Sequence, residues 1–199
     1  RWSSALNTKH FHKMWKFMAN DEEYISKFSW FVKIDMDTVF MPQTLKNKYL
    51  SSPRHNSPDL RESNTAWGSP IPGPVELFSR GALRSFGLRH EKECDTGLGE
   101  SMSIYDEWQQ EDMYIYKCLE KLGYRNIEPS QGWRLDFETP ESAYRQMQTG
   151  EEHICWKERG GEDTCIVRSE VRDRVIALHM HKQLEQMRIV KDWIGRDVA

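Results

Sequence analysis

Apolar residues recur at helical and strand spacing along most of the chain, and they predict a series of alternating elements. The first predicted helix carries one apolar stripe, formed by Phe11, Met14, Trp15 and Met18. Either Asn7 or Thr8 is its expected N-cap. The run Trp30–Ile34 is rich in aromatic and β-branched residues, which predicts a buried strand. The first part of the chain is therefore expected to form a helix followed by a strand.

The same patterns predict further elements downstream. In chain order, these are a helix over 43–49, a strand over 75–78, a helix from Ser79 through Phe86, a helix over 109–122, a strand over 125–128, a strand over 175–181 and a helix over 182–194. Ser79 is the expected N-cap of its helix, and Gly87 and Gly123 are expected to end the two helices before them. Stretches dense in polar and turn-forming residues predict three loops, over 51–74, 88–107 and 130–170. Because helices and strands alternate, we expect an α/β fold.

Length and composition limit the classes of function that fit the chain. Its 199 residues fit a single domain of ordinary size. The net charge of −3 argues against nucleic acid as the main partner, since binding to phosphates relies on positive charge. The sequence contains neither a run of about eighteen apolar residues nor a signal peptide. Because it begins with Arg1, we expect it to be a piece of a longer protein.

Four cysteines leave the redox state open at this stage. They are Cys94, Cys118, Cys155 and Cys165. None forms a CxxC pair, which argues against a zinc ribbon or a thioredoxin-type redox site. Two sequential disulfides, two other connectivities and four buried reduced thiols all fit the sequence.

The stretch that follows the first predicted strand carries the most informative candidate chemistry. Asp35 and Asp37 lie two residues apart at the carboxyl end of that strand, where ligands bind in α/β sheets. In an extended chain this spacing points both carboxylates to one side, and a divalent cation would relieve their repulsion. The alternative is a strand-to-turn junction in which Asp serves as a turn former.

Three further sets of residues suggest chemistry or ligand binding. Glu111 and Asp112 open the long helix, either as acids favoured by the helix dipole or as the place of a general base. His179 and His181 share one face of a predicted strand, either as half-exposed residues or as metal ligands. Eight tryptophans are spread along the chain, several in predicted loops, where they suit both loop anchoring and the binding of sugars.

The order in which these motifs follow one another is itself informative. The motifs are Ser29-Trp30-Phe31-Val32-Lys33-Ile34-Asp35-Met36-Asp37-Thr38, then Pro72-Gly73-Pro74-Val75-Glu76-Leu77-Phe78-Ser79, then Glu111-Asp112, and finally Val175-Ile176-Ala177-Leu178-His179. This order resembles the Fringe and core 1 β1,3-galactosyltransferase family. Its members read Asp-Trp-Phe-Leu-Lys-Ala-Asp-Asp-Asp-Thr, then Gly-Gly-Ala-Gly-Tyr-x-Leu-Ser, then Glu-Asp, then Ser-Phe-His. The first block is specific, whereas Pro72-Gly73-Pro74-Val75 replaces the glycine block here.

The resemblance implies a GT-A fold, with residues 1–199 as the carboxyl-terminal part of a single catalytic domain. It implies an inverting glycosyltransferase that moves a sugar, by family default galactose in a β1,3 linkage, from a UDP-sugar to a glycan or glycoprotein acceptor with Mn²⁺. The same resemblance implies a type II membrane protein of the Golgi lumen, whose anchor is absent from this chain. In the family, the strands that grip uridine precede the Asp-x-Asp strand. We therefore expect a mixed sheet that lacks them, and weak or no binding of UDP by this chain alone.

The resemblance also assigns roles to individual residues. Asp37 matches the direct metal ligand, and Asp35 matches the Asp that binds near the ribose or the donor sugar. His179 matches the metal-binding histidine, Asp112 matches the catalytic base, and His181 has no family counterpart. We therefore expect Asp37 and His179 to lie on facing strand ends and to chelate Mn²⁺. We further expect Asp112 to point into the same cleft as Asp37.

The cysteines and two rival functions complete these expectations. Cys94 and Cys118 match a family disulfide, and we hypothesise that Cys155 pairs with Cys165. One rival function is a non-catalytic fragment or pseudoenzyme with a structural or glycan-binding role, which the replaced glycine block favours. The other is a carboxylate–metal hydrolase that uses the same carboxylates and histidines.

Overall fold

The computed structural model divides the chain into two compact units, each with its own hydrophobic core. The described residues are 5–36, 38–52, 56–67, 75–95, 111–127, 134–138, 141–157, 163–169, 171, 175–179 and 184–195. For residues 5–9, 48, 49, 67, 95, 111, 134–138, 141, 163, 175, 176, 179 and 184 the description covers the backbone alone. The first unit comprises residues 1–33 and 56–128, and the second comprises residues 34–55 and 129–199.

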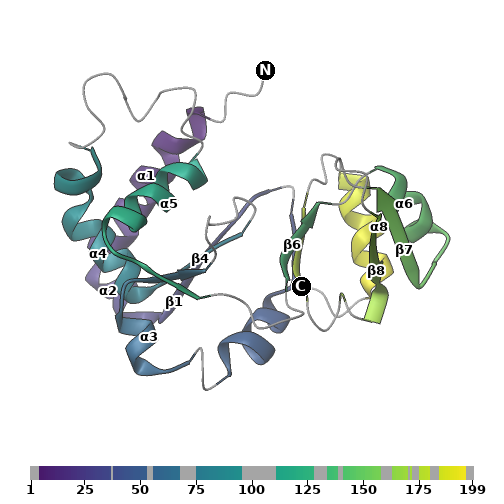
Figure 1. The fold of residues 1–199 in the computed structure, drawn as a ribbon, viewed down its shortest axis with the longest axis horizontal. Coiled ribbons are helices and arrows are strands. Elements are labelled where there is room, and N and C mark those ends of the chain that lie inside the picture. Colours follow the sequence, from purple (N-terminus) through teal and green to yellow (C-terminus); the bar gives the residue numbers. More distant parts are fainter. Residues whose placement is uncertain are drawn as a thin grey trace. The chain divides into compact units, whose positions relative to one another are not determined.

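The first unit packs helices on a mixed sheet (Figure 1). Its elements are, in chain order, α1 (Ala5–Asn20), α2 (Glu22–Lys27), β1 (Trp30–Ile34), α3 (Pro58–Glu62), β3 (Thr65–Trp67), β4 (Val75–Ser79), α4 (Arg80–His90), the π-helical η2 (Glu91–Asp95), α5 (Glu111–Lys121) and β5 (Arg125–Ile127). The strands are ordered β1-β4-β3-β5, with β3 antiparallel to β4 and parallel to β5. Helices α1, α4 and α5 lie side by side over this sheet.

The core of the first unit uses the apolar faces that the sequence predicts. Trp15 of α1 contacts Phe78 of β4 edge to face, with ring centroids 4.9 Å apart. On α5, Ile115 and Leu119 of the predicted stripe are buried. Gly123 follows this helix with φ of 72°, the left-handed conformation that suits glycine after a helix end. The predicted first strand, the strand at 75–78 and the long helix are therefore confirmed as β1, β4 and α5.

Two helix boundaries in the first unit differ from prediction. Helix α1 begins at Ala5, so Asn7 and Thr8 lie inside the helix and neither is its N-cap. The predicted end of α4 at Gly87 is wrong, since the helix continues past this residue. A Cβ at Gly87 would lie 2.6 Å from Cβ of Ala19 on α1. This glycine therefore allows α1 and α4 to approach closely and does not end a helix.

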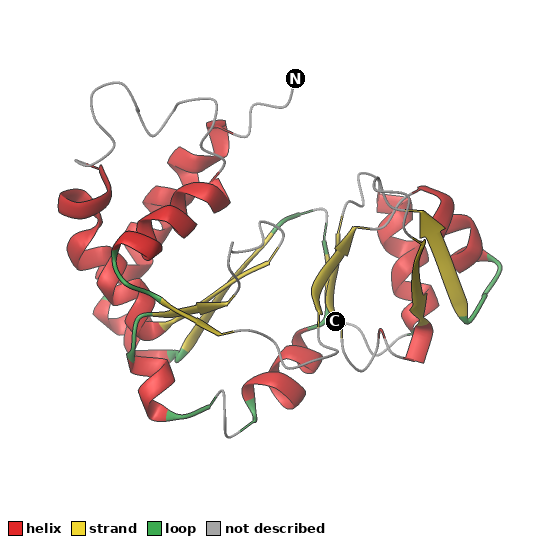
Figure 2. Ribbon diagram, in the orientation of Figure 1, coloured by secondary structure: helices red, strands yellow, loops and turns green. Residues whose placement is uncertain are grey.

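The second unit combines two small sheets with two longer helices (Figure 2). Its elements are, in chain order, β2 (Val39–Phe40), the π-helical η1 (Thr44–Leu50), β6 (Arg134–Glu138), α6 (Glu141–Gln148), β7 (His153–Lys157), β8 (Asp163–Val167), β9 (Val175–His179) and α8 (Leu184–Ile194). One sheet has the order β2-β9-β6, with β9 antiparallel to β2 and parallel to β6. The other is the antiparallel pair β7 and β8. The core joins α6 and α8 to these strands through residues such as Tyr144, Leu178 and Trp193.

All three predicted loops contain regular structure. The stretch 88–107 includes the end of α4 and all of η2, so the prediction of a loop is wrong there. The stretch 51–74 includes α3 and β3, and the stretch 130–170 includes β6, α6, β7 and β8, so both predictions are wrong there. Strand β7 is hard to recognise from the sequence because its two buried residues, Ile154 and Trp156, alternate with exposed ones. The helices expected over 43–49 and 182–194 are confirmed as η1 and α8. The last predicted strand is confirmed as β9, with residues 180 and 181 outside the described part of the chain.

Both expected disulfides are present, one in each unit. Cys94 is bonded to Cys118, and both residues are buried in the core, where they tie η2 to α5. Cys155 is bonded to Cys165 across the β7–β8 ladder, in which the two residues are direct partners and both are exposed. The pairing predicted for the four cysteines is therefore confirmed.

The α/β class is confirmed at this level, since helices pack on sheets with parallel and antiparallel pairs. None of the described helices combines the length and apolar character needed to cross a lipid bilayer.

Candidate active site

The Asp-x-Asp motif forms a tight turn between β1 and β2. The backbone N–H of Thr38 donates to the carbonyl oxygen of Asp35 at 3.1 Å, which is the i to i+3 hydrogen bond of a β-turn. Asp35 is half-buried and Met36 is 96% exposed, whereas Asp37 lies outside the described residues. The backbone turns between Asp35 and Thr38, and the shared direction predicted for the two carboxylates stays a prediction. Asp35 takes the turn-forming role at the point where the chain leads into β2.

The sheet of the second unit brings this turn to one end of β9. In the antiparallel pair, Val39 at the start of β2 lies opposite Leu178. Strand β9 ends one residue later at His179, beside the point where the Asp-x-Asp turn leads into β2. The backbones of β2 and β9 are therefore neighbours at this end of the sheet. Asp37, His181 and the His179 side chain lie outside the described part of the structure, so chelation stays a prediction.

The donor groups expected at this sheet end fit a divalent cation. Carboxylate oxygens suit Mg²⁺, Ca²⁺ and Mn²⁺, and imidazole nitrogens suit first-row transition ions, so a mixed set fits Mn²⁺. Among the side chains that the structure describes, no group of three or more His, Cys, Asp or Glu residues gathers to hold a metal ion. The Asp37 carboxylate and the His179 imidazole are not among those side chains.

Asp112 lies in the first unit, at the amino-terminal turn of α5. Its Oδ1 accepts a hydrogen bond from the backbone N–H of Met113 at 2.8 Å, and the residue is half-buried. Tyr114 and Ile115, which follow it on the helix, are buried in the core. The half-buried carboxylate therefore lies next to the buried face of the helix. Asp112 and the Asp-x-Asp turn belong to different units, and the cleft expected between them stays a prediction.

A buried ion pair directly before the motif is a feature that the sequence analysis missed. Lys33 Nζ on β1 lies 3.3 Å from Glu76 Oε1 on β4, and the two side chains are 2% and 0% exposed. The same ammonium group lies 4.8 Å from the ring centroid of Phe11 on α1, a cation–π contact. Because buried charges require partners, this pair fixes β1 against β4 two residues before Asp35. The sequence does carry a signal for this pair. Lys33 is two residues from Phe31, so the two share the inward face of a buried strand, where a charged residue needs a partner.

The corner between β4 and α4 follows the replaced glycine block and is built around Ser79. The Ser79 hydroxyl accepts hydrogen bonds from the backbone N–H groups of Ala82 at 3.0 Å and Thr65 at 3.1 Å. It donates to the carbonyl oxygen of Ser63 at 2.6 Å. The predicted N-cap is therefore confirmed, and the same hydroxyl also joins β4 to the chain before β3. Residues 72–74 of the glycine block lie outside the described part of the chain.

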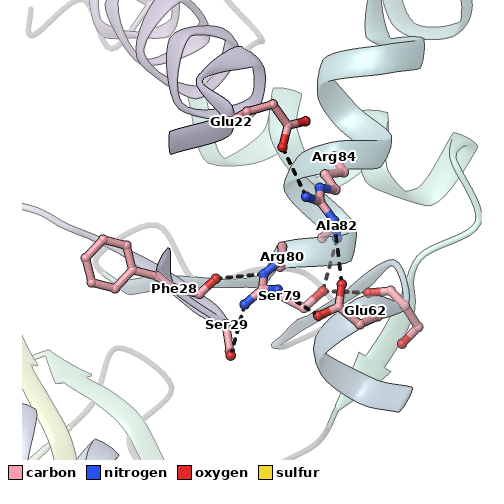
Figure 3. Close-up of polar contacts among 9 residues, drawn as sticks. Glu22, Phe28, Ser29, Glu62, Ser79, Arg80, Ala82 and Arg84 are labelled. Carbon is pink, nitrogen blue, oxygen red and sulfur yellow. Dashed lines mark hydrogen bonds and ion pairs between the residues drawn. The ribbon is translucent and has the colours of Figure 1, made fainter. Parts of the chain in front are cut away.

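Two arginines of α4 extend this corner with ion pairs (Figure 3). Arg80 pairs with Glu62 at 3.1 Å and donates from Nε to the carbonyl oxygen of Phe28 at 3.0 Å. Arg84 pairs with Glu22 at 3.3 Å. These contacts hold α4 to α2 and α3, so both arginines have structural partners in this corner.

No protein-family model matches this chain, and no curated protein matches it either.

Proposed function

We propose that this chain is part of an inverting, Mn²⁺-dependent glycosyltransferase with a GT-A fold, of the Fringe and core 1 β1,3-galactosyltransferase type. Its donor is a UDP-sugar, with galactose as the first sugar to test, and its acceptor is a glycan or glycoprotein in the Golgi lumen. The observation that carries the proposal is the Asp-x-Asp turn that leads into β2, whose ladder lies at the His179 end of β9. The two disulfides agree with a luminal protein, because such bonds persist in oxidising compartments.

Asp37 and His179 are the residues that would hold the metal ion, with Asp35 beside the ribose or donor sugar. When bound, Mn²⁺ acts as a Lewis acid that balances the negative charge of the diphosphate. The sequence supplies a carboxylate and an imidazole for this role. The backbone supports their use together, because β2 and β9 are hydrogen-bonded neighbours.

Asp112 is the proposed general base. Its carboxylate accepts the proton of the acceptor hydroxyl while that oxygen bonds to the anomeric carbon. The bond from the anomeric carbon to the diphosphate oxygen breaks on the opposite face, and UDP leaves with the electron pair. One displacement of this kind inverts the configuration at the anomeric carbon. The half-buried position at the start of α5 supports this role, since a carboxylate there is ordered and still reachable.

Turnover of UDP-sugars by the purified full-length protein to which this chain belongs, with and without Mn²⁺, tests the proposal. Asp112→Asn should abolish turnover and leave the binding of UDP and Mn²⁺ nearly unchanged, because it removes the base and keeps the shape of the side chain. Glu120→Gln on the exposed face of the same helix is the matched control and should keep full turnover. Turnover retained in Asp112→Asn would mean that the base lies elsewhere.

A non-catalytic, glycan-binding role is the second candidate, and the replacement of the glycine block by Pro72-Gly73-Pro74-Val75 favours it. Glycine lets a backbone approach a ligand closely, and proline and valine limit that approach. Glycan binding without hydrolysis or transfer of any UDP-sugar, in the presence of Mn²⁺, would favour this role over catalysis.

A further inference from the structure

The disulfide between Cys155 and Cys165 lies on the outer face of the β7–β8 ladder. Both cysteines are exposed. Backbone alternation places His153 and Lys157 on the same face of β7 as Cys155, two residues to either side, and both of these side chains are exposed as well. The disulfide is therefore open to reagents in solution, and it lies beside two basic side chains.

The two cysteines occupy a level of the ladder that has no backbone hydrogen bond between the strands. The backbone N–H of Cys155 donates to Oε1 of Gln146 on α6 at 3.1 Å, and its carbonyl oxygen accepts from Nε2 of the same side chain at 2.9 Å. In an antiparallel strand the N–H and C=O of one residue point to the same side, so those of Cys155 point away from β8. The Cα atoms of Cys155 and Cys165 lie 4.1 Å apart, as expected for the closer pairs of such a ladder.

Other contacts hold the two strands together when the disulfide is open. Because hydrogen-bonded pairs alternate with the closer pairs, they fall on Ile154 with Ile166 and on Trp156 with Thr164. Ile154, Trp156 and Ile166 are buried in the core of the second unit. The hydrogen bonds of Gln146 hold the other edge of β7. These contacts keep the two thiols close together after reduction, so the bond can form again.

From these features we infer that the Cys155–Cys165 disulfide is a reversible site of thiol–disulfide exchange with a dithiol. Exposed disulfides are the ones that thiols reach and that serve regulation or catalysis. The inference concerns a second site of the molecule and does not depend on sugar transfer.

The residues around the disulfide determine which sulfur leaves first. Two basic residues flank Cys155 on β7, whereas Asp163 and Val167 flank Cys165 on β8 at the same spacing. Positive charge next to a cysteine favours its thiolate. Cys155 is therefore the sulfur that leaves, and Cys165 is the sulfur that the dithiol attacks.

The exchange proceeds through a mixed disulfide. A thiolate of the dithiol attacks Sγ of Cys165, the bond between the two cysteine sulfurs breaks, and its electron pair leaves on Sγ of Cys155. The second sulfur of the dithiol then bonds to the first, which releases Cys165 as a thiolate. The dithiol leaves as a disulfide after giving two electrons to the protein, and its two protons pass through solvent to the two cysteines.

Graded reduction of the full-length protein with dithiothreitol tests reversibility. Alkylation with iodoacetamide and peptide mapping should show Cys155 and Cys165 fully open at concentrations that leave the Cys94–Cys118 bond intact. Hydrogen exchange in this state should show unchanged protection of α6 and β7, and dialysis against oxidised glutathione should restore the bond. Loss of protection in α6 and β7 on reduction, or failure of the bond to form again, would overturn the inference.

A trapping experiment tests which sulfur leaves. Brief exposure to glutathione and iodoacetamide should place glutathione on Cys165 and the alkyl group on Cys155. Lys157→Gln should slow the opening by about two- to fivefold, the effect of one exposed charge. Lys121→Gln, which removes an exposed lysine of α5, is the matched control and should leave the rate unchanged. Glutathione found on Cys155, or equal rates in the two lysine variants, would overturn the assigned direction of attack.

Discussion

Charged groups serve different ends in the two units. In the first unit, Lys33 and Glu76 are buried against each other between β1 and β4, and they contribute to holding the sheet together. In the second unit, His179, which is one of the two proposed metal ligands, is the last residue of β9. Strand ends are open to ligands, whereas strand centres are enclosed by neighbouring elements. The buried pair stabilises the sheet of the first unit, whereas the proposed metal ligand of the second unit lies at a strand end.

The disulfides show the same contrast. The Cys94–Cys118 bond is enclosed by the core of the first unit, whereas the Cys155–Cys165 bond lies exposed on a two-stranded ladder. Core residues around the first bond lose packing when it is removed, and the second bond has fewer neighbours to disturb. The two disulfides have the same chemistry, but losing Cys94–Cys118 is expected to lower stability more than losing Cys155–Cys165.

The largest effect is expected from breaking the buried ion pair. Glu76→Gln removes the carboxylate charge that lies against the buried Lys33 ammonium, which should lower the free energy of unfolding by about 3–5 kcal/mol. The double variant Lys33→Met with Glu76→Leu removes both charges and should return close to wild-type stability. Urea denaturation measures both values.

An exposed ion pair in the same unit is the control for this comparison. Lys27 and Glu23 pair at 2.6 Å on α2, with both side chains more than half exposed. Glu23→Gln should change stability by less than about 1 kcal/mol. If the double variant Lys33→Met with Glu76→Leu were as unstable as Glu76→Gln, the idea that each buried charge stabilises the other would be contradicted.

Removing each disulfide in turn should lower the free energy of unfolding by different amounts in the two units. In the chain-entropy model, a separation of 24 residues contributes about 3.5 kcal/mol and a separation of 10 contributes about 2.7 kcal/mol. Replacing Cys94 and Cys118 by alanine also disturbs the core, so its cost should exceed that of the same change at Cys155 and Cys165. Urea denaturation of the two double variants measures the difference, and limited reduction followed by mass spectrometry should open the exposed bond first. Equal losses of unfolding free energy, together with simultaneous reduction of both disulfides, would contradict the expected difference between the two bonds.

A methyl group at Gly81 should damage the first unit selectively. A Cβ at this position would lie 2.2 Å from the carbonyl oxygen of Glu62 and 2.3 Å from that of Ser63, so the backbone must move. Gly81→Ala should therefore cost about 3 kcal/mol, and Ser85→Ala on the same helix should cost less than about 0.5 kcal/mol. Hydrogen exchange resolves the effect by region, with a larger loss of protection in α4 than in α8. Equal loss in both helices would mean that the units unfold together.

The smallest effect is expected from exposed ion pairs at the end of α4. Hydrogen bonding to Arg89 lowers the pKa of Glu93, and hydrogen bonding to Lys16 lowers the pKa of Glu91, both from an ordinary value of 4.5. A lowered carboxyl pKa adds stability that is present above the unfolded-state pKa and is lost as pH falls below it. Arg89→Gln should thus lower the melting temperature slightly at neutral pH, and this effect should fade as the pH falls through the lowered pKa of Glu93. A difference that grows on acidification would contradict this assignment.

The sequence by itself predicted the elements that bury a continuous apolar face. The stripes of α1 and α5 and the apolar runs of β1 and β4 are confirmed because each meets a core that demands this pattern. The N-cap at Ser79 and the glycine after α5 follow from local hydrogen bonding and backbone conformation, which neighbouring residues determine. The Asp-x-Asp, Glu-Asp and strand-histidine motifs were visible for the same reason, since each is a short local pattern.

Only the tertiary structure decided which distant residues meet. Gly87 follows the pattern of a helix stop, yet Ala19 of α1 occupies the space beside it and the helix continues. Strand β6 has too weak a pattern to be predicted, and its pairing with β9 brings Glu138 beside His179. Lys33 finds Glu76 only when β1 and β4 pair. The physical reason is common to all three, because a residue's partner across a sheet or between helices is set by packing and register, which no local pattern encodes.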